Sequence, residues 1–130
     1  MRQARILSIE DNPQMRLLLQ LIFERKGHRV VGVRKGEIGL ELLRSLNPDV
    51  LLLDLMLPDI DGWDLYQQMK ADNQLSQVPV IIVSARNEAQ DAARGYRVIE
   101  PDRFVQKPFD VDSLVTTVEG VLQHHFALDH

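Results

Sequence analysis

The sequence predicts an α/β fold: a doubly wound sheet of five parallel strands with helices on both faces. Three observations lead to this prediction. Five short apolar segments of strand length alternate along the chain with segments of helical periodicity. Two of those segments, residues 50–53 and 80–83, are apolar at every position, as strands covered on both faces must be. The length of 130 residues suits one domain with a substantial core.

The composition is that of a globular protein and excludes several other classes. Hydrophobic residues make up 45% of the chain and charged residues 26%, close to the globular average. The absence of cysteine excludes disulfide bonds, thiol catalysis and cysteine-bound zinc, and the formal net charge of −4 argues against direct nucleic acid binding. No apolar run reaches the roughly 18 residues of a membrane span, and the N-terminus does not resemble a signal peptide. We therefore expect a cytoplasmic domain that has no membrane partner.

The first strand and the first helix have clear boundaries in the sequence. Residues 5–9 form an apolar segment of strand length. Asn12 then offers an N-cap oxygen, and Pro13 suits the first position of a helix. Gly27 ends this helix, whose apolar residues follow helical spacing at Met15, Leu18, Leu19 and Ile22.

The second strand and helix follow directly. Residues 28–33 predict a strand that is less apolar than the first. Residues 36–46 predict a helix, which Pro48 cannot continue. The side of this helix expected to face the core holds Ile38, Leu42 and Leu46.

The middle of the chain holds the two most apolar segments. Residues 50–53 predict a central strand, and residues 57–62 predict a loop because they contain proline, glycine and acidic side chains. A helix is expected over residues 63–70. Residues 80–83 predict the next strand, which is also buried on both faces.

The last third of the chain completes the alternation. A polar, alanine-rich helix is expected over residues 87–96, and a short strand at residues 104–105. Asp110 caps a final helix, and a frayed C-terminal tail over residues 124–130 leaves a domain of residues 1–123. The apolar stripe of the final helix consists of Val111, Leu114, Val115, Val118, Val121 and Leu122.

The apolar character of the strands predicts their order in the sheet. The segments around Leu7, Leu52 and Ile81 are the most apolar and should be central, whereas the strands at 28–33 and 104–105 should lie at the edges. This placement fits the order 2-1-3-4-5, a common order of doubly wound sheets. Ligands of such sheets bind beyond the carboxyl ends of the strands, so the residues that follow the strands are the candidates for function.

Charged and hydroxyl side chains follow four of the five strands. They are Glu10 and Asp11, Asp54, Ser84 and Lys107. Three carboxylates at one rim repel each other unless a cation shares the site, and oxygen ligands of this kind suit Mg²⁺. A carboxylate beside Mg²⁺ can act as a nucleophile toward a phosphoryl group, whose oxygens a metal, a hydroxyl and an ammonium group would neutralise.

In these features the sequence resembles the receiver domain of two-component response regulators, from about Arg5 to Leu122. The resemblance implies a flavodoxin-like (βα)5 fold and a signalling module rather than an enzyme. It rests on four motifs in the expected order, Glu10-Asp11, Asp54-Leu55-Met56-Leu57-Pro58 with Asp61-Gly62, Ser84-Ala85, and Phe104 with Lys107-Pro108-Phe109.

The resemblance implies a role for each matching residue. Asp54 would accept a phosphoryl group from a phosphohistidine of a sensor kinase. Asp11, Asp54 and the backbone carbonyl of Met56 would bind Mg²⁺ directly, and Glu10 would act through water.

Four further residues of the family pattern concern the phosphoryl oxygens and the switch. Ser84 and Lys107 would hold the phosphoryl oxygens, and Phe104 would turn inward when Ser84 moves. The bond between Lys107 and Pro108 would be cis and would aim the ammonium group.

The implied partners are a sensor histidine kinase or phosphotransfer protein and a downstream effector protein or domain. A phosphorylation-dependent dimer also fits the family. The sequence departs from the family pattern in three places: Glu10 replaces the commoner aspartate, Ser84 replaces threonine, and Glu100-Pro101-Asp102 replaces Gly-Ala-Asp. The last helix also lacks the arginine-rich pattern of receivers that dimerise to drive a winged-helix domain.

Three alternatives remain open at this point. One is a phosphohydrolase similar to haloacid dehalogenases. The segment Asp59-Ile60-Asp61-Gly62 resembles the first motif of that family, and Ser84 and Lys107 follow it in the expected order. Against it, the preceding strand ends at Asp54 and Trp63 stands where threonine is expected. The others are a receiver cut from a larger multidomain regulator and a receiver that serves only as a binding scaffold.

Overall fold

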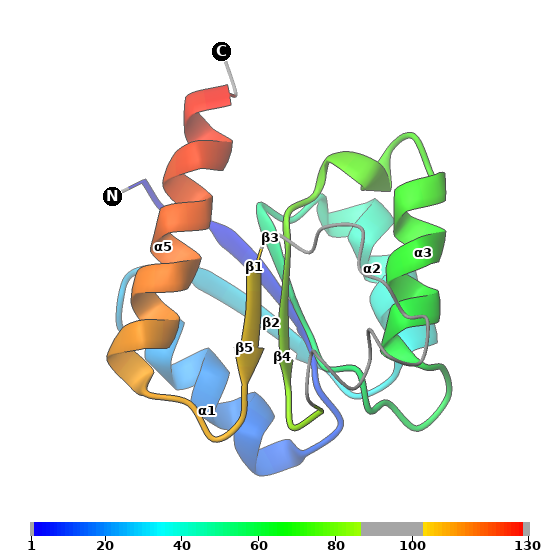
Figure 1. Ribbon diagram of the computed structural model, residues 1–130. Coiled ribbons are helices and arrows are strands. Elements are labelled where there is room, and N and C mark those ends of the chain that lie inside the picture. Colours follow the sequence, from blue (N-terminus) through cyan, green and yellow to red (C-terminus); the bar gives the residue numbers. More distant parts are fainter. Residues whose placement is uncertain (1, 87–102, 129–130) are drawn as a thin grey trace.

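The computed structural model describes residues 2–86 and 103–128. Its five strands are parallel and lie in the order β2-β1-β3-β4-β5, which confirms the predicted fold class and strand order (Figure 1). The strands are β1 (Arg5–Ile9), β2 (Arg29–Val33), β3 (Val50–Leu53), β4 (Val80–Ser84) and β5 (Arg103–Gln106). The helices are α1 (Pro13–Glu24), α2 (Gly36–Leu46), α3 (Gly62–Ala71), the short 3₁₀ helix η1 (Leu75–Gln77) and α5 (Val111–Leu128).

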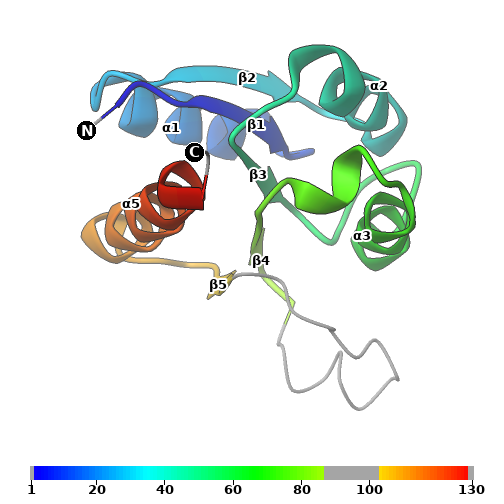
Figure 2. The ribbon, with the colours of Figure 1, turned by 90° about the horizontal axis from the view of Figure 1, so that it is seen from above.

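The sheet separates two apolar cores. Helices α1 and α5 cover one face, and α2 and α3 cover the other (Figure 2). Side chains of successive strand residues alternate between the faces, so Ile6 and Leu52 belong to the core beneath α1 and α5. Leu7 and Leu51 belong to the core beneath α2 and α3. Both faces of β3 are therefore buried, as its unbroken apolar run predicted.

The ends of α1 are formed by the residues that the sequence indicated. The Asn12 side chain accepts a hydrogen bond of 2.9 Å from the backbone N–H of Met15, and Pro13 occupies the first turn. Gly27 has a φ angle of 91°, a conformation that glycine adopts without steric cost. The chain thus reverses after α1 and enters β2, next to β1.

The predicted core-facing side of α2 was only partly right. Ile38 is 46% exposed, whereas Leu42 is partly buried and packs against the core beneath α2 and α3. The buried residues of this helix are Gly36, Gly39 and Leu43. A Cβ atom at Gly39 would collide with the side chain of Ile9, so the glycine side of α2 lies directly against the sheet. Apolar periodicity could not identify this face, because two of its three buried residues have no side chain.

Smaller differences concern the ends of the elements. Helix α3 extends one residue beyond each end of the predicted range, η1 was not predicted, and β4 includes Ser84. Helix α5 continues through Leu128, although a frayed tail was expected from residue 124 onward. Here His125 Nε2 lies 3.3 Å from Asp49 Oδ1, and the Arg2 guanidinium lies 4.1 Å from the centre of the Phe126 ring.

Two expectations fall outside the described residues, namely the helix at 87–96 and the segment 100–102 before β5. In the described part of the chain, no helix is both long and apolar enough to cross a membrane.

Candidate functional site

The carboxyl ends of the central strands are in register, and this brings the candidate residues to one edge of the sheet. Ile9 of β1 pairs with Leu53 of β3, which pairs in turn with Ile82 of β4. The residues after these positions therefore follow the strands at similar heights. Glu10 and Asp54 lie at this edge and are both buried, 2% and 7% exposed.

Lys107 joins these two carboxylates. Its Nζ atom lies 2.6 Å from Glu10 Oε1 and 3.2 Å from Asp54 Oδ2. The lysine side chain is 16% exposed, so this three-membered cluster is largely shielded from solvent. One ammonium group thus faces two buried carboxyl groups, so the cluster has a surplus of negative charge when both are ionised.

Burial and the neighbouring Asp54 both act on the titration of Glu10. Together they raise the pKa of Glu10 to about 7, burial being the larger cause, although the hydrogen bond from Lys107 opposes them. An added cation at this edge would relieve the repulsion between Glu10 and Asp54.

The backbone around Asp54 fixes the direction of its carboxylate. The Asp54 N–H donates to Ile9 O at 3.0 Å, which continues the ladder between β1 and β3. Asp54 Oδ1 accepts a hydrogen bond of 3.0 Å from the Met56 N–H. The other oxygen, Oδ2, is the one that faces Lys107. The two oxygens of Asp54 therefore have distinct environments.

Ser84 and Lys107 are placed by the pairing of β4 with the chain after β5. The Lys107 N–H donates to Ser84 O at 2.8 Å, and the Lys107–Pro108 peptide bond is cis. Ser84 is fully buried, and its hydroxyl oxygen accepts a hydrogen bond of 3.2 Å from the Arg86 N–H.

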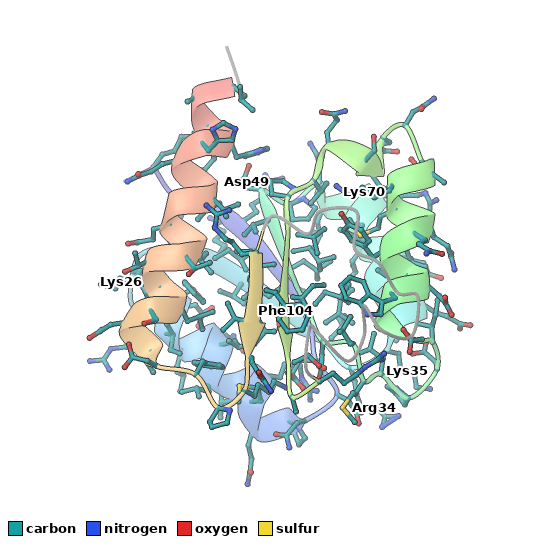
Figure 3. All side chains as sticks on the ribbon, in the orientation of Figure 1. Lys26, Arg34, Lys35, Asp49, Lys70 and Phe104 are labelled. Atoms are coloured by element: carbon teal, nitrogen blue, oxygen red, sulfur yellow. The ribbon has the colours of Figure 1, made fainter. Side chains whose placement is uncertain are left out.

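Asp11 has a different environment from the residues of this cluster. Its carboxylate is 46% exposed, and Oδ1 lies 3.8 Å from Nε of Arg34, a residue labelled in Figure 3. In residues 2–86 and 103–128 no three carboxylate or histidine side chains gather as a ready-made metal site. Asp11 and Asp54 nevertheless provide hard oxygen ligands on neighbouring strands, beside surplus negative charge. This donor set fits Mg²⁺, which binds through one or two carboxylates and keeps several waters.

Phe104 lies in β5, on the face of the sheet that α2 and α3 cover. Its ring, labelled in Figure 3, is partly buried against the core beneath α2 and α3. The centre of the ring lies 6.4 Å from that of Trp63. The residue is therefore already in contact with the core in this structure.

Several contacts around the site were not predicted from the sequence. Asp61 caps α3 by accepting from the Trp63 N–H at 2.9 Å, and its second oxygen lies 2.9 Å from Arg86 Nη1. Asp59 accepts hydrogen bonds of 2.9 Å from the N–H groups of Gly36 and Glu37 at the start of α2. Aspartate is a preferred N-cap residue, but the other contacts join segments far apart in sequence and leave no local pattern.

Asp59 and Asp61 also bear on the phosphohydrolase alternative. Both carboxylates of the Asp59-Ile60-Asp61-Gly62 segment bind helix N-termini, and neither follows a strand directly. They are therefore committed to structural contacts, whereas Asp54 stands immediately after β3.

Comparisons with known proteins agree with this geometry. Residues 6–119 match the family model of the response regulator receiver domain. PilH of Pseudomonas aeruginosa is 34% identical over 119 residues, which span 92% of this chain and 98% of PilH. The transcriptional regulatory protein AfsQ1 of Streptomyces coelicolor is 38% identical over 91% of this chain and 51% of its own length.

A solved structure extends the agreement to the fold. The receiver domain of a signal transduction histidine kinase from Syntrophus aciditrophicus superposes with a TM-score of 0.84 and 28% identity, over 93% of this chain and 91% of that domain. The chain spans nearly all of PilH but only about half of the transcriptional regulators that it matches. The match of 114 consecutive residues to one family and the identity with PilH establish the relationship. The chain therefore belongs to the response regulator receiver domains, signalling modules of two-component systems rather than classical enzymes.

Proposed function

We propose that this receiver domain accepts a phosphoryl group on Asp54 from a phosphohistidine, in the presence of Mg²⁺. The main supporting observation is the position of Asp54 at the end of the central strand, with one oxygen 3.2 Å from the Lys107 ammonium. The other oxygen is held by the Met56 N–H. The carboxylate is thus held in one orientation, and it faces an ammonium group that can stabilise the negative charge of a phosphoryl group.

The proposed step is an in-line displacement at phosphorus. A carboxylate oxygen of Asp54 attacks, the bond between phosphorus and the imidazole nitrogen breaks, and the departing histidine keeps the electron pair of that bond. The product is an acyl phosphate on Asp54. Lys107 Nζ is the group best placed to contact a phosphoryl oxygen, since it already lies beside Asp54 Oδ2.

Mg²⁺ would be held by Asp11, Asp54 and the backbone carbonyl of Met56, with Glu10 acting through water. When bound, the ion would neutralise charge on the carboxylates and on the transferred phosphoryl group. Asp11 would have to turn from Arg34 toward Asp54, because its carboxylate now lies 3.8 Å from the arginine.

The switch would connect Ser84 with Phe104. The Ser84 hydroxyl would donate its O–H to a phosphoryl oxygen, while its oxygen now accepts from the Arg86 N–H. The strands β4 and β5 are paired, with Ile82 opposite Phe104 and Ser84 opposite Gln106. A shift of Ser84 would therefore displace the paired strand that contains Phe104. In this way phosphorylation would change the surface that binds partners.

The partners that follow from this function are a sensor histidine kinase or phosphotransfer protein and a downstream effector. PilH and the transcriptional regulators are relatives with different overall lengths, so either a protein or an attached domain could serve as effector. A phosphorylation-dependent dimer, a receiver domain of residues 1–123 and a cytoplasmic location remain predictions from the sequence.

The test is the mass of the intact protein after incubation with acetyl phosphate, with and without Mg²⁺. We expect one added phosphoryl group in wild type only when Mg²⁺ is present, and none in Asp54→Asn. Labelling of Asp54→Asn to the same extent would refute the assignment. If wild type gains no mass, binding of beryllofluoride would separate a short-lived acyl phosphate from a receiver that acts only as a scaffold. Continuous hydrolysis of a phosphate monoester would instead favour the phosphohydrolase alternative.

A further inference from the structure

An arginine of α1 binds the backbone of the acidic pair, Glu10 and Asp11. Arg16 Nη1 donates a hydrogen bond of 2.9 Å to the carbonyl oxygen of Glu10 and a longer one of 3.4 Å to that of Asp11. Arg16 lies in the first turn of α1, where its own N–H donates to Asn12 O. The guanidinium thus links the first turn of α1 to the loop that precedes it.

A glycine in β2 makes room for this arrangement. A Cβ atom at Gly32 would lie 2.7 Å from Arg16 Cγ and 3.1 Å from Cδ. Gly32 faces the α1 side of the sheet, like the buried Val30 two residues earlier. The methylene groups of Arg16 therefore lie across β2 in the space that any other side chain at residue 32 would fill. A glycine inside a strand commonly marks such a close approach.

The backbone at Glu10 is also bound to β2. Its N–H donates a hydrogen bond of 2.9 Å to Val33 O, one residue beyond Gly32. The side chain of Glu10 is turned inward to Lys107, and that of Asp11 outward to Arg34. With both carbonyls bound to Arg16, the backbone dihedral angles that set these two directions are constrained.

We propose that Arg16, packed against Gly32, is a positioning residue for the Mg²⁺ site. It holds the backbone of Glu10 and Asp11 in the conformation from which their side chains can bind the ion together with Asp54. This inference rests on the proposed function, because it assumes that the acidic pair binds Mg²⁺. Arg16 acts on the backbone and does not touch the ion. Its removal should loosen the acidic pair and weaken Mg²⁺ binding more than it weakens the fold.

Two substitutions test the proposal by independent routes. Arg16→Met keeps the methylene stem and removes the donors. Gly32→Ala leaves Arg16 in the sequence but pushes its stem away from β2. Gly120→Ala is the matched control, since a Cβ atom at Gly120 meets nothing within 4 Å. For each protein, the Kd for Mg²⁺ is measured by NMR titration of the full chain with MgCl₂, and unfolding by urea is measured in EDTA.

We expect the Kd for Mg²⁺ to rise about tenfold in both Arg16→Met and Gly32→Ala, the size usual for residues that orient metal ligands. Gly120→Ala should keep the wild-type Kd. A purely structural role for Arg16 would lower the resistance to urea in Arg16→Met and Gly32→Ala but leave the Kd for Mg²⁺ unchanged. A wild-type Kd in either variant would overturn the proposal.

Failure of the proposed function would give a different result. If the NMR spectrum of wild type does not respond to MgCl₂, the assigned Mg²⁺ site is wrong, and the positioning role of Arg16 is wrong as well. Asp11→Asn is included to make the distinction, because it must weaken Mg²⁺ binding if the site is correct. Should Arg16→Met fail to fold, Gly32→Ala still decides the question.

Discussion

The ammonium group of Lys107 lies 2.6 Å from Oε1 of Glu10, across 97 residues of sequence. The same group lies 3.2 Å from Asp54 Oδ2, so a single cation serves two buried carboxylates. The contact joins the first strand of the sheet to the loop after the last one. It is therefore both a structural link between the two halves of the sheet and the centre of the proposed chemistry.

Lys107→Met should destabilise the protein and stop the switch. Its removal would leave Glu10 and Asp54 buried without a counter-charge, at a cost of about 1–3 kcal/mol in the free energy of unfolding. Urea unfolding at neutral pH without Mg²⁺ measures this, with the exposed Lys26→Met as the control. A loss no larger than that of the control would show that the cluster does not depend on its lysine.

Asp54→Asn should have the opposite effect on stability when Mg²⁺ is absent. It removes one of two carboxylates that repel each other in the buried cluster, and a gain of roughly 1 kcal/mol is expected. Addition of Mg²⁺ should then raise the melting temperature of wild type but not of the variant, because only a ligand of the native state stabilises it. Calorimetry with and without MgCl₂ tests both parts, and Glu41→Gln on the exposed side of α2 serves as a charge control. Equal stabilisation of wild type and Asp54→Asn by Mg²⁺ would place the ion elsewhere.

Asp59 should contribute stability that depends on pH. Burial acts to raise the pKa of Asp59, but hydrogen bonds from the Glu37 and Gly36 N–H groups hold this pKa below its usual value of 3.8. A carboxyl group with a lowered pKa in the folded state stabilises the protein above its unfolded pKa, and the contribution disappears as the pH falls through the folded value. Asp59→Ala should therefore lower the free energy of unfolding by about 1 kcal/mol at pH 7 and by less near pH 3.

The matched variant for this cap is Asp59→Asn, which keeps one oxygen acceptor and loses the charge. It should lie between wild type and Asp59→Ala at pH 7 and resemble wild type more closely in acid. Unfolding by urea at pH 7 and pH 3 gives the comparison. A pH-independent difference between wild type and Asp59→Ala would mean that the charge of Asp59 contributes nothing to the cap.

The sequence was sufficient for those parts of the structure that follow from local pattern and from parallel topology. Strand-length apolar runs predicted the five strands and which of them are central, an arrangement that fits the order 2-1-3-4-5. The ends of the predicted strands indicated Glu10, Asp54 and Lys107 as candidate residues. Contacts between loops were not accessible in this way. Arg86 and Asp61 are 25 residues apart, and Asp59 caps a helix that begins 23 residues earlier. Such pairs depend on how the β3–α3 loop is folded, which no periodicity encodes.

Helix α2 shows a second limit, and it leads to the last prediction. Gly39→Ala should destabilise the protein, although alanine is the better helix former, because the new Cβ would collide with Ile9. Overpacking of this kind costs roughly 1–3 kcal/mol. Combining Gly39→Ala with Ile9→Val should recover part of this loss, since the smaller side chain removes the Cδ1 atom that stands nearest. A double-mutant cycle by urea unfolding measures the coupling, and additive effects of the two substitutions would show that α2 adjusts its position instead of pressing on Ile9.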